Sequence, residues 1–410
     1  MSAGTDRDAA FWPVAATLCL GVALPILMAP ASKSSPLLLA IATVLSVIAL
    51  WRRGLAWPVI DQAVGAARAP GAILSIGLLA LMAVSILWAH DRVSSANQFV
   101  RFILPVMFAV VLALAFPVIA DRRRTAWWLA GAAIAALIMA IDIRTGLTLR
   151  KLTGGRATDY SYNRGLVTLV VLAWPLLALA VTRGRAWWAV ALLPIPLAVL
   201  IGESQTAVLG VLAGFAVFPV AWFLPKLTRL AGLAAMLVLL ATAPFIGTIA
   251  SKTLGGGFHR TFEAGHSDDR VKIWLSFEAA THQHWISGNG FGSTLNMQNA
   301  PVAAAVPPER VLLLGASHPH NAFLQLWAEL GLVGAILSAL LAVRLFDAVG
   351  RLKPILQPFV LTWIAVMSAI ALVSHGAWQA WWVAAIAASA AGFLAIEREL
   401  REDEASAPPL

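Results

Sequence analysis

The motif His318-Pro319-His320-Asn321 brings residues suited to proton transfer to one point of the chain. It precedes an apolar run that includes Phe323, so Pro319 marks an abrupt entry into a predicted helix. A histidine at such a junction is half-buried beside water, and its reference pKa of about 6.5 suits a general base at neutral pH. A helix cap or an interface anchor would use the same side chains. His320 is the candidate base, and Asn321 is a candidate substrate contact.

Two further motifs place arginines where they could bind an anion. The motifs are Tyr160-Ser161-Tyr162-Asn163-Arg164-Gly165, which contains both tyrosines of the chain, and Asp269-Arg270-Val271-Lys272-Ile273-Trp274. A guanidinium can fork onto two phosphate oxygens. Tethering of a helix to lipid headgroups, or an ion pair of Arg270 with Asp268 or Glu263, would explain the same residues without a substrate. Arg164 and Arg270 are candidate phosphate contacts, with Asn163 beside the first.

A metal site is the competing use of the histidines. His282-x-His284 and His318-x-His320 each offer two nitrogens. Side chains two apart on a helix diverge by about 200°, so each pair could share a metal only in extended chain. The single cysteine, Cys19, has no partner for a disulfide or a cysteine-rich site. We expect neither a catalytic metal nor a cofactor.

Composition determines which kind of element positions these residues. Of 410 residues, 60% are hydrophobic and 12% are charged, against about 25% charged in a typical soluble domain. Apolar runs recur from end to end, so lipid must solvate most of the chain. This excludes a soluble enzyme, a secreted disulfide scaffold and a disordered chain. Membrane lipids are expected partners, and nucleic acid is not.

About twelve apolar stretches are long enough to cross a hydrocarbon core of roughly 30 Å. They are 11–29, 36–51, 71–89, 100–119, 126–143, 165–182, 186–201, 204–224, 228–250, 320–345, 355–375 and 379–397. The stretches 36–51 and 186–201 are short and could be tilted or incomplete. The first stretch is expected to be retained rather than cleaved, because its flank is not clearly basic. The predicted fold is an all-α polytopic membrane protein, a single integral-membrane domain over 1–410 with about twelve transmembrane helices.

Lysine and arginine predict the orientation. With both termini cytoplasmic, more than half of the 29 basic residues fall in inside loops, as the positive-inside rule requires. Ten others lie in two outer segments: Arg144, Arg150, Lys151, Arg156 and Arg164, then Lys252, Arg260, Arg270, Lys272 and Arg310. The second segment, 251–319, is predicted to be a partly helical periplasmic cap between the ninth and tenth helices, with a helix starting at Ser267. Charge placed against the insertion bias indicates an anionic substrate on the outer face.

The order of these features resembles the O-antigen ligase and O-antigen polymerase superfamily. The shared features are about twelve spans, a long outer loop before the tenth, an arginine and then a tryptophan at its start, Gly288-x-Gly290-x-Gly292, and Pro-His-Asn followed by Glu329-x-Gly331. The resemblance covers approximately residues 70–385. It implies a glycosyltransferase of the bacterial cytoplasmic (inner) membrane that moves a glycan from an undecaprenyl-diphosphate carrier to an acceptor hydroxyl on the periplasmic face.

The resemblance also implies roles for particular residues. The family's loop histidine matches His320, and its diphosphate-binding arginines best match Arg164 and Arg270. Many relatives have a Ser-Arg pair at the start of the span after the short seventh, where this chain has Ser204-Gln205. Gln205 keeps hydrogen bonding without charge, so one phosphate contact would be missing or supplied by Arg156 or Arg260. Arginines would stabilise the leaving diphosphate without a metal, and His320 would deprotonate the acceptor, giving inversion.

Three functions remain open at this point. A ligase passes the glycan to lipid A-core, which we expect here, whereas an O-antigen or exopolysaccharide polymerase passes it to another lipid-linked glycan; both share these motifs. A transporter of lipid-linked sugar is the rival from another class. Ion-coupled transporters usually bury ionisable groups at mid-membrane. Here the spans are almost free of such groups, with Glu329 the chief exception.

Overall fold

The computed structural model of the protein describes residues 3–154, 157–158, 160–254 and 267–406. Within these residues the chain is all helical, without strands, and ten segments are long and apolar enough to cross a membrane. They are Ala10–Leu27, within α1 (Ala3–Leu18), η1 (Cys19–Ala23) and α2 (Leu24–Leu27); α3 (Ser35–Arg52); α5 (Pro70–Ser85) with η2 (Ile86–Trp88); α6 (Arg92–Ile119); Arg123–Arg144, within α7 (Arg122–Thr125) and α8 (Trp127–Arg144); α10 (Asn163–Thr182); α12 (Gln205–Phe223); Pro225–Thr253, made of α13 (Pro225–Thr242), η4 (Ala243–Phe245) and α14 (Ile246–Thr253); α17 (Ala322–Gly350); and α19 (Ala380–Ser406).

Two of the twelve predicted spans are shorter apolar helices. Residues 186–201 form η3 (Ala186–Leu192) and α11 (Pro194–Ile201), and residues 357–373 form α18 (Gln357–Val373). The multi-pass helical architecture is therefore confirmed, while the described residues contain ten segments of full length rather than twelve.

The sequence pattern missed two local features. α4 (Ala56–Ala67) lies between the second and third long segments, where the prediction has a loop. α6 begins at Arg92, eight residues before the predicted stretch, because Asp91 caps it by accepting a hydrogen bond from the Ser94 backbone N–H at 3.0 Å. Arg101 lies inside this helix and interrupts the apolar pattern without ending the helix.

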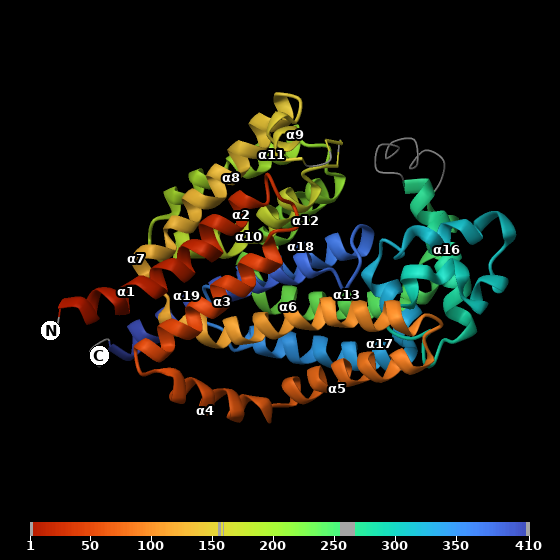
Figure 1. Cartoon of the computed structure of the whole chain (residues 1–410), viewed down its shortest axis with the longest axis horizontal. Coiled ribbons are helices and arrows are strands. Elements are labelled where there is room, and N and C mark those ends of the chain that lie inside the picture. The colour runs from red at the N-terminus through yellow and green to blue at the C-terminus, as the bar shows by residue number, and fades with distance from the viewer. Residues whose placement is uncertain (1–2, 155–156, 159, 255–266, 407–410) are drawn as a thin grey trace.

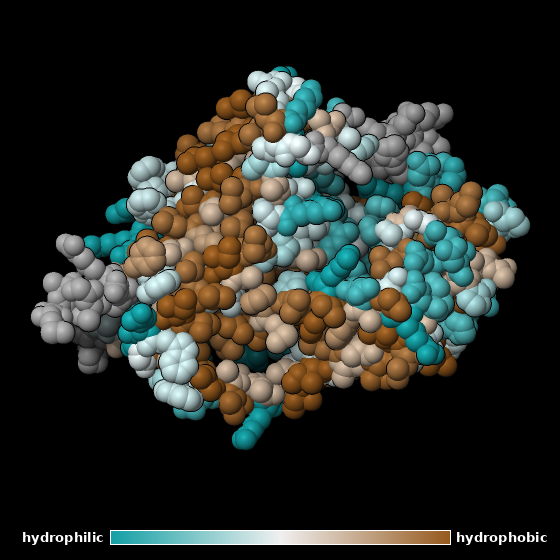
Figure 2. All heavy atoms as spheres, viewed as in Figure 1, coloured by the Kyte–Doolittle hydropathy of each residue, from teal (hydrophilic) through white to brown (hydrophobic). Residues whose placement is uncertain are grey.

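The two termini lie at one end of the molecule, and α16 (Ser267–Gln283) lies at the opposite end (Figure 1). Hydrophilic side chains gather around α16, and hydrophobic ones cover much of the bundle (Figure 2). The remaining 3₁₀ segments near α16 are η6 (Ser293–Asn299), η7 (Pro301–Ala305) and η8 (Pro308–Ala316). The predicted helix start at Ser267 is confirmed. The termini and α16 thus lie at opposite ends of the molecule.

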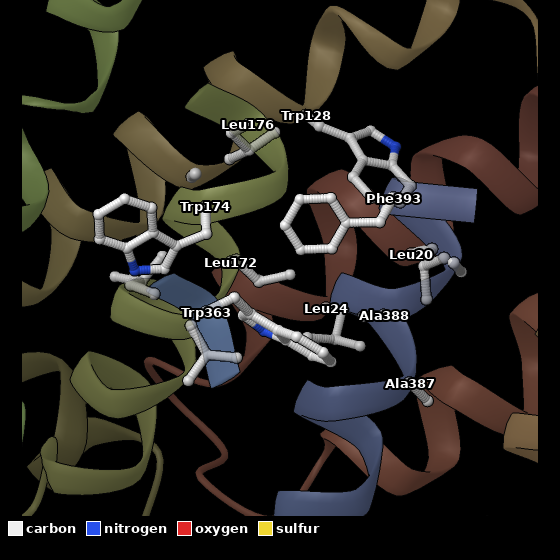
Figure 3. Close-up of a cluster of buried hydrophobic side chains, with 14 of the residues drawn as sticks. Leu20, Leu24, Trp128, Leu172, Trp174, Leu176, Trp363, Ala387, Ala388 and Phe393 are labelled. Carbon is white, nitrogen blue, oxygen red and sulfur yellow. The ribbon is translucent and has the colours of Figure 1, made fainter. Parts of the chain in front are cut away.

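α10 occupies the centre of the bundle, with most of its residues buried. Leu172, Trp174 and Leu176 of α10 lie among side chains from α8, α18 and α19 (Figure 3). Trp128 of α8 donates its indole N–H to the Thr17 carbonyl at 3.0 Å, which satisfies its polar atom inside the apolar core. This packing fixes the end of α10 that carries the predicted motif at 160–165.

α17 is interrupted at Gly331, whose φ of 61° and ψ of −157° lie outside the helical region. The loop with the three spaced glycines pairs with the interrupted helix: the Asn289 N–H donates to the Ala328 carbonyl at 2.9 Å, and the Gly290 N–H donates to the Glu329 carbonyl at 2.9 Å. A Cβ on Gly288 would lie 2.3 Å from the Glu329 carbonyl. Glycine is therefore required by the close approach as well as by its φ of 67°.

The Glu329 side chain closes this junction. Its carboxyl group is fully buried and accepts four hydrogen bonds: from the Gly292 N–H (2.7 Å), the Thr294 hydroxyl (2.5 Å), the Gln325 amide (3.0 Å) and the Trp378 indole N–H (2.8 Å). We call these five residues the Glu329 cluster. Because its members come from the glycine loop, η6, α17 and the loop before α19, the cluster joins four segments at the α16 end of the bundle.

Candidate functional site

A cavity of about 1100 Å³ opens at the α16 end of the molecule. Its described lining residues come from five separate segments: Pro30, Ala31, Ser32 and Lys33; Arg150, Thr158, Tyr160, Ser161, Asn163 and Arg164; Asp269, Arg270 and Ile273; His318 and His320; and Ser374, His375 and Gln379. The cavity thus brings together His320, Arg164 and Arg270, the three residues to which the sequence assigned the central roles.

His320 is held in one orientation. Its Nδ1–H donates to the Ser374 carbonyl at 2.8 Å; because a carbonyl can only accept, the proton lies on Nδ1, and no described residue donates to the Nε2 lone pair. Burial lowers the pKa of His320, and the nearby Arg270 lowers it further, against the opposing effect of the Ser374 bond. The imidazole is therefore neutral at pH 7 and can accept a proton at Nε2. Its backbone φ of 52° is unusual for a residue with a side chain.

The imidazole rings of His318 and His320 lie next to each other, although Pro319 stands between the two residues in the chain. The ring centroids of His318 and His320 are 4.4 Å apart, and both rings line the cavity. The left-handed backbone at Ser317 and His320 turns the chain back on itself, and the His320 N–H donates to His318 Nδ1 at 3.2 Å. Burial and the adjacent His320 lower the pKa of His318 to about 3.

Arg164 and Arg270 line the same cavity, although they belong to different sequence motifs. The Arg164 guanidinium lies over the Trp381 ring, 5.9 Å from its centroid. Within the described residues neither guanidinium makes an ion pair. Asp268, a possible partner of Arg270, instead pairs with Lys272 at 2.6 Å, and burial lowers the pKa of Arg270. Partly buried guanidiniums without a carboxylate partner are suited to an anionic ligand.

The rest of the lining strengthens the positive charge. Arg150 is 4% exposed, donates to the Ser161 carbonyl and lies 4.8 Å from the Tyr162 ring centroid. Lys33 adds a further ammonium group from the loop between α2 and α3. Asp269 is the one carboxylate among the described lining residues. Four cationic side chains therefore face a single carboxylate, and the cavity attracts anions.

The other predicted contacts have different positions. Asn163 lines the cavity and accepts a hydrogen bond from the Ser204 hydroxyl at 2.6 Å. Asn321 is fully buried and is not among the lining residues; its Oδ1 caps α17 by accepting from the Leu324 N–H at 3.0 Å. Gln205 starts α12 with an exposed side chain and does not line the cavity. The structure thus gives Asn321 a capping role and leaves Gln205 outside the described lining of the cavity.

Two predicted contacts, Arg156 and Arg260, lie outside the described residues. The site prediction also missed three ionisable lining residues that lie outside the predicted motifs: Lys33, Arg150 and His375. Arg150 belongs to the outer basic segment, and that excess of charge was the available signal. Lys33 and His375 are far from the motifs in sequence, so only their convergence in space identifies them. Burial and neighbouring His318 lower the pKa of His375 to about 3, so this imidazole is neutral as well.

Among the described residues, no group of three or more histidine, cysteine, aspartate or glutamate side chains is placed to hold a metal ion. The charge that this site presents to a ligand comes from guanidinium and ammonium groups.

The comparisons with known proteins bear on the same region. A search of curated proteins found no match. Residues 188–339 match the family model described as O-antigen ligase, and this range contains Arg270, His320 and Glu329, while Arg164 precedes it. The family indicates glycosyl transfer of the O-antigen ligase or polymerase type. The match confirms over these residues the resemblance of the chain to the O-antigen ligase and polymerase superfamily.

Proposed function

We propose that the protein transfers a glycan from an undecaprenyl-diphosphate carrier to an acceptor hydroxyl at the periplasmic face of the bacterial inner membrane, with lipid A-core as the acceptor. One observation carries the proposal: the free Nε2 of a neutral His320 shares a cavity with Arg164 and Arg270, which lack ion-pair partners in the described chain. The cavity therefore combines a proton acceptor with a binding site for a leaving diphosphate.

The arginines act on the leaving group. As the bond between the anomeric carbon and the diphosphate oxygen breaks, the diphosphate keeps the electron pair and its negative charge grows. Arg164 and Arg270 are half-buried, so they meet this charge in a poorly hydrated setting where the attraction is strong. This stabilisation favours the transition state over the ground state and needs no metal ion.

His320 acts on the acceptor. Its Nε2 takes the proton of the acceptor hydroxyl while the oxygen attacks the anomeric carbon from the side opposite the diphosphate, which inverts the configuration in one displacement. The Nδ1–H bond to Ser374 holds the ring and stabilises the imidazolium that forms. The lipid tail of the carrier stays in the bilayer beside the bundle.

The proposal includes an orientation in the membrane. It rests on the enrichment of lysine and arginine in loops at the end of the molecule that carries the termini. Both termini are cytoplasmic and the cavity is periplasmic. A reporter that is active only in the periplasm should be active when fused at Ala303 and inactive at Ala405; the reverse pattern would reject this orientation.

Particular observations bear on two other functions, a polymerase and a transporter. An O-antigen or exopolysaccharide polymerase would use the same cavity, and the family match covers it equally. A transporter is disfavoured, because the carboxyl group of Glu329 already accepts four hydrogen bonds within the protein. No lone pair is left there for a coupling ion.

The test is a reconstituted assay with purified lipid-linked glycan and either lipid A-core or a second lipid-linked glycan as acceptor. His320→Gln should abolish transfer yet still bind the donor, because glutamine keeps polarity but cannot accept a proton near neutral pH. Wild-type transfer should survive EDTA. Substantial turnover by His320→Gln would reject the general base, and loss in EDTA that added metal restores would reject a metal-free mechanism. Transfer only to the lipid-linked glycan would identify a polymerase.

A further inference from the structure

A smaller pocket of about 290 Å³ adjoins the cationic cavity. The two share Thr158 and Asn163 in their linings, and the side pocket extends from there toward Glu203 and Lys151. Its walls are formed by ends of α8, α10 and α11, by α9 (Thr148–Leu152) and by the loops that follow α8, α9 and α11; α8, α9 and α11 lie in the upper part of Figure 1. A ligand in the side pocket would lie next to a group bound in the cavity.

The polar groups of the side pocket are arranged for hydrogen bonding. Ser204 donates to Asn163 Oδ1 at 2.6 Å and accepts from the Ala207 N–H at 3.2 Å. These bonds fix the Asn163 amide, and its NH₂ group has no acceptor among the described residues, so that nitrogen can donate to a ligand. Glu203 and Lys151 line the same pocket with exposed side chains, and neither makes an ion pair within the described residues.

The balance of charge separates this pocket from the cavity. Its described lining holds one carboxylate and one ammonium group, whereas the cavity lining holds four cations and one carboxylate. Glu203 repels a phosphate but accepts hydrogen bonds from hydroxyl groups, and Lys151 and Asn163 donate to them. Leu147, Leu166 and Ile201 supply an apolar wall. Donors, acceptors and an apolar wall together suit a neutral ring that carries hydroxyl groups on its edge and C–H groups on its faces.

We propose that the side pocket is a saccharide subsite, in which Glu203, Lys151 and Asn163 hold a neutral sugar unit while the diphosphate occupies the adjoining cavity. The proposal rests on the proposed function and adds a specificity determinant to it. A sugar bonded to the diphosphate can reach the side pocket from the cavity past Asn163. A sugar of the acceptor presents the same chemistry, and the two sources are separated by experiment.

The experiment compares wild type, Glu203→Ala and Glu203→Gln, with Glu309→Ala as the matched control, since Glu309 is an exposed carboxylate that lines neither pocket. Binding of undecaprenyl diphosphate without sugar is measured beside binding of the lipid-linked glycan purified from the cells that make it. Glu203→Ala should weaken binding of the glycan-bearing lipid about tenfold, since a charged group loses its hydrogen bonds. Binding of the sugar-free lipid should be unchanged, Glu203→Gln should lie between, and the control should match wild type.

Steady-state transfer then identifies the source of the sugar. A tenfold rise in KM for the donor with unchanged kcat assigns the subsite to the donor, and the same rise confined to the acceptor, without the donor-binding defect, assigns it to the acceptor. Equal weakening of the sugar-free lipid would show a phosphate site and overturn the proposal. Wild-type binding and KM in Glu203→Ala would also overturn it. These results are distinct from failure of the proposed function, in which wild-type protein would transfer no glycan at all.

Discussion

Arg164 and Arg270 are half-buried without ion-pair partners in the described chain, whereas the carboxyl group of Glu329 is fully buried with four hydrogen-bond donors around it. The cationic cavity and the Glu329 cluster lie at the same end of the bundle and share the loop before α19, through Gln379 and Trp378. This difference in hydrogen bonding distinguishes two roles of ionisable groups in lipid-solvated bundles. A group whose bonds are all made inside the protein holds segments together, and a group left without partners is available to a ligand.

The Glu329 cluster should give the largest effect, on stability. Glu329→Ala removes the acceptor of four buried donors, and each unpaired donor costs about 1–3 kcal/mol. The melting temperature of Glu329→Ala in detergent should fall by roughly 5 °C or more. That of Glu329→Gln should fall less, because glutamine keeps one acceptor oxygen. Arg270→Ala, the matched variant from the cavity, should melt like wild type. Equal melting temperatures of Glu329→Ala and wild type would show that the Glu329 cluster does not hold these segments together.

The cavity should give the next effect, on transfer. Arg164→Ala and Arg270→Ala should each lower the rate about 100-fold, as expected when one donor to a developing anion is lost. Replacing either arginine with lysine should restore only part of the transfer rate, because lysine cannot make the planar two-point contact with phosphate. Arg92→Ala, at an exposed arginine outside the cavity lining, is the control in the reconstituted assay. A normal rate for either cavity variant at equal protein level would remove that arginine from the site.

His318 should give an intermediate effect. His318→Ala removes the acceptor of the His320 N–H and so frees a backbone that is held at a positive φ. Loss of one such bond costs about 1 kcal/mol, which corresponds to a roughly fivefold lower rate. The melting temperature should change little. A loss as complete as that of His320→Gln would instead show that His318 takes part in the chemistry.

The smallest effect concerns pH. Burial, helped by Arg270, lowers the pKa of His320, so the neutral form that accepts a proton persists below the ordinary value of 6.5. The transfer rate of wild type should therefore stay nearly constant between pH 7.5 and pH 6.5 and fall only at lower pH. A rate that halves by pH 6.5 would show an unshifted imidazole and weaken the description of the cavity as poorly hydrated.

The architecture follows from composition, since a chain with 60% hydrophobic residues must satisfy its backbone polar groups in helices inside a membrane. The local sequence also determined the helix start at Ser267 and the excess of arginine near Arg164 and Arg270, because capping patterns and charge are local properties. The number of spans was predicted less well, because residues 357–373 are apolar but form a helix of only 17 residues.

Which residues meet in the cavity depends on how the helices pack in three dimensions. Lys33, Arg150 and His375 reach the cavity from the loop between α2 and α3, from α9 and from the loop between α18 and α19, and the helix rotation and tilt that bring these segments together depend on packing against neighbours rather than on local sequence. The direction of the His318 ring depends on the left-handed backbone at Ser317 and His320. The glycine loop and Glu329 are 37 residues apart at the Gly292 contact, and their hydrogen bonds form only because α17 opens at Gly331 to receive the loop.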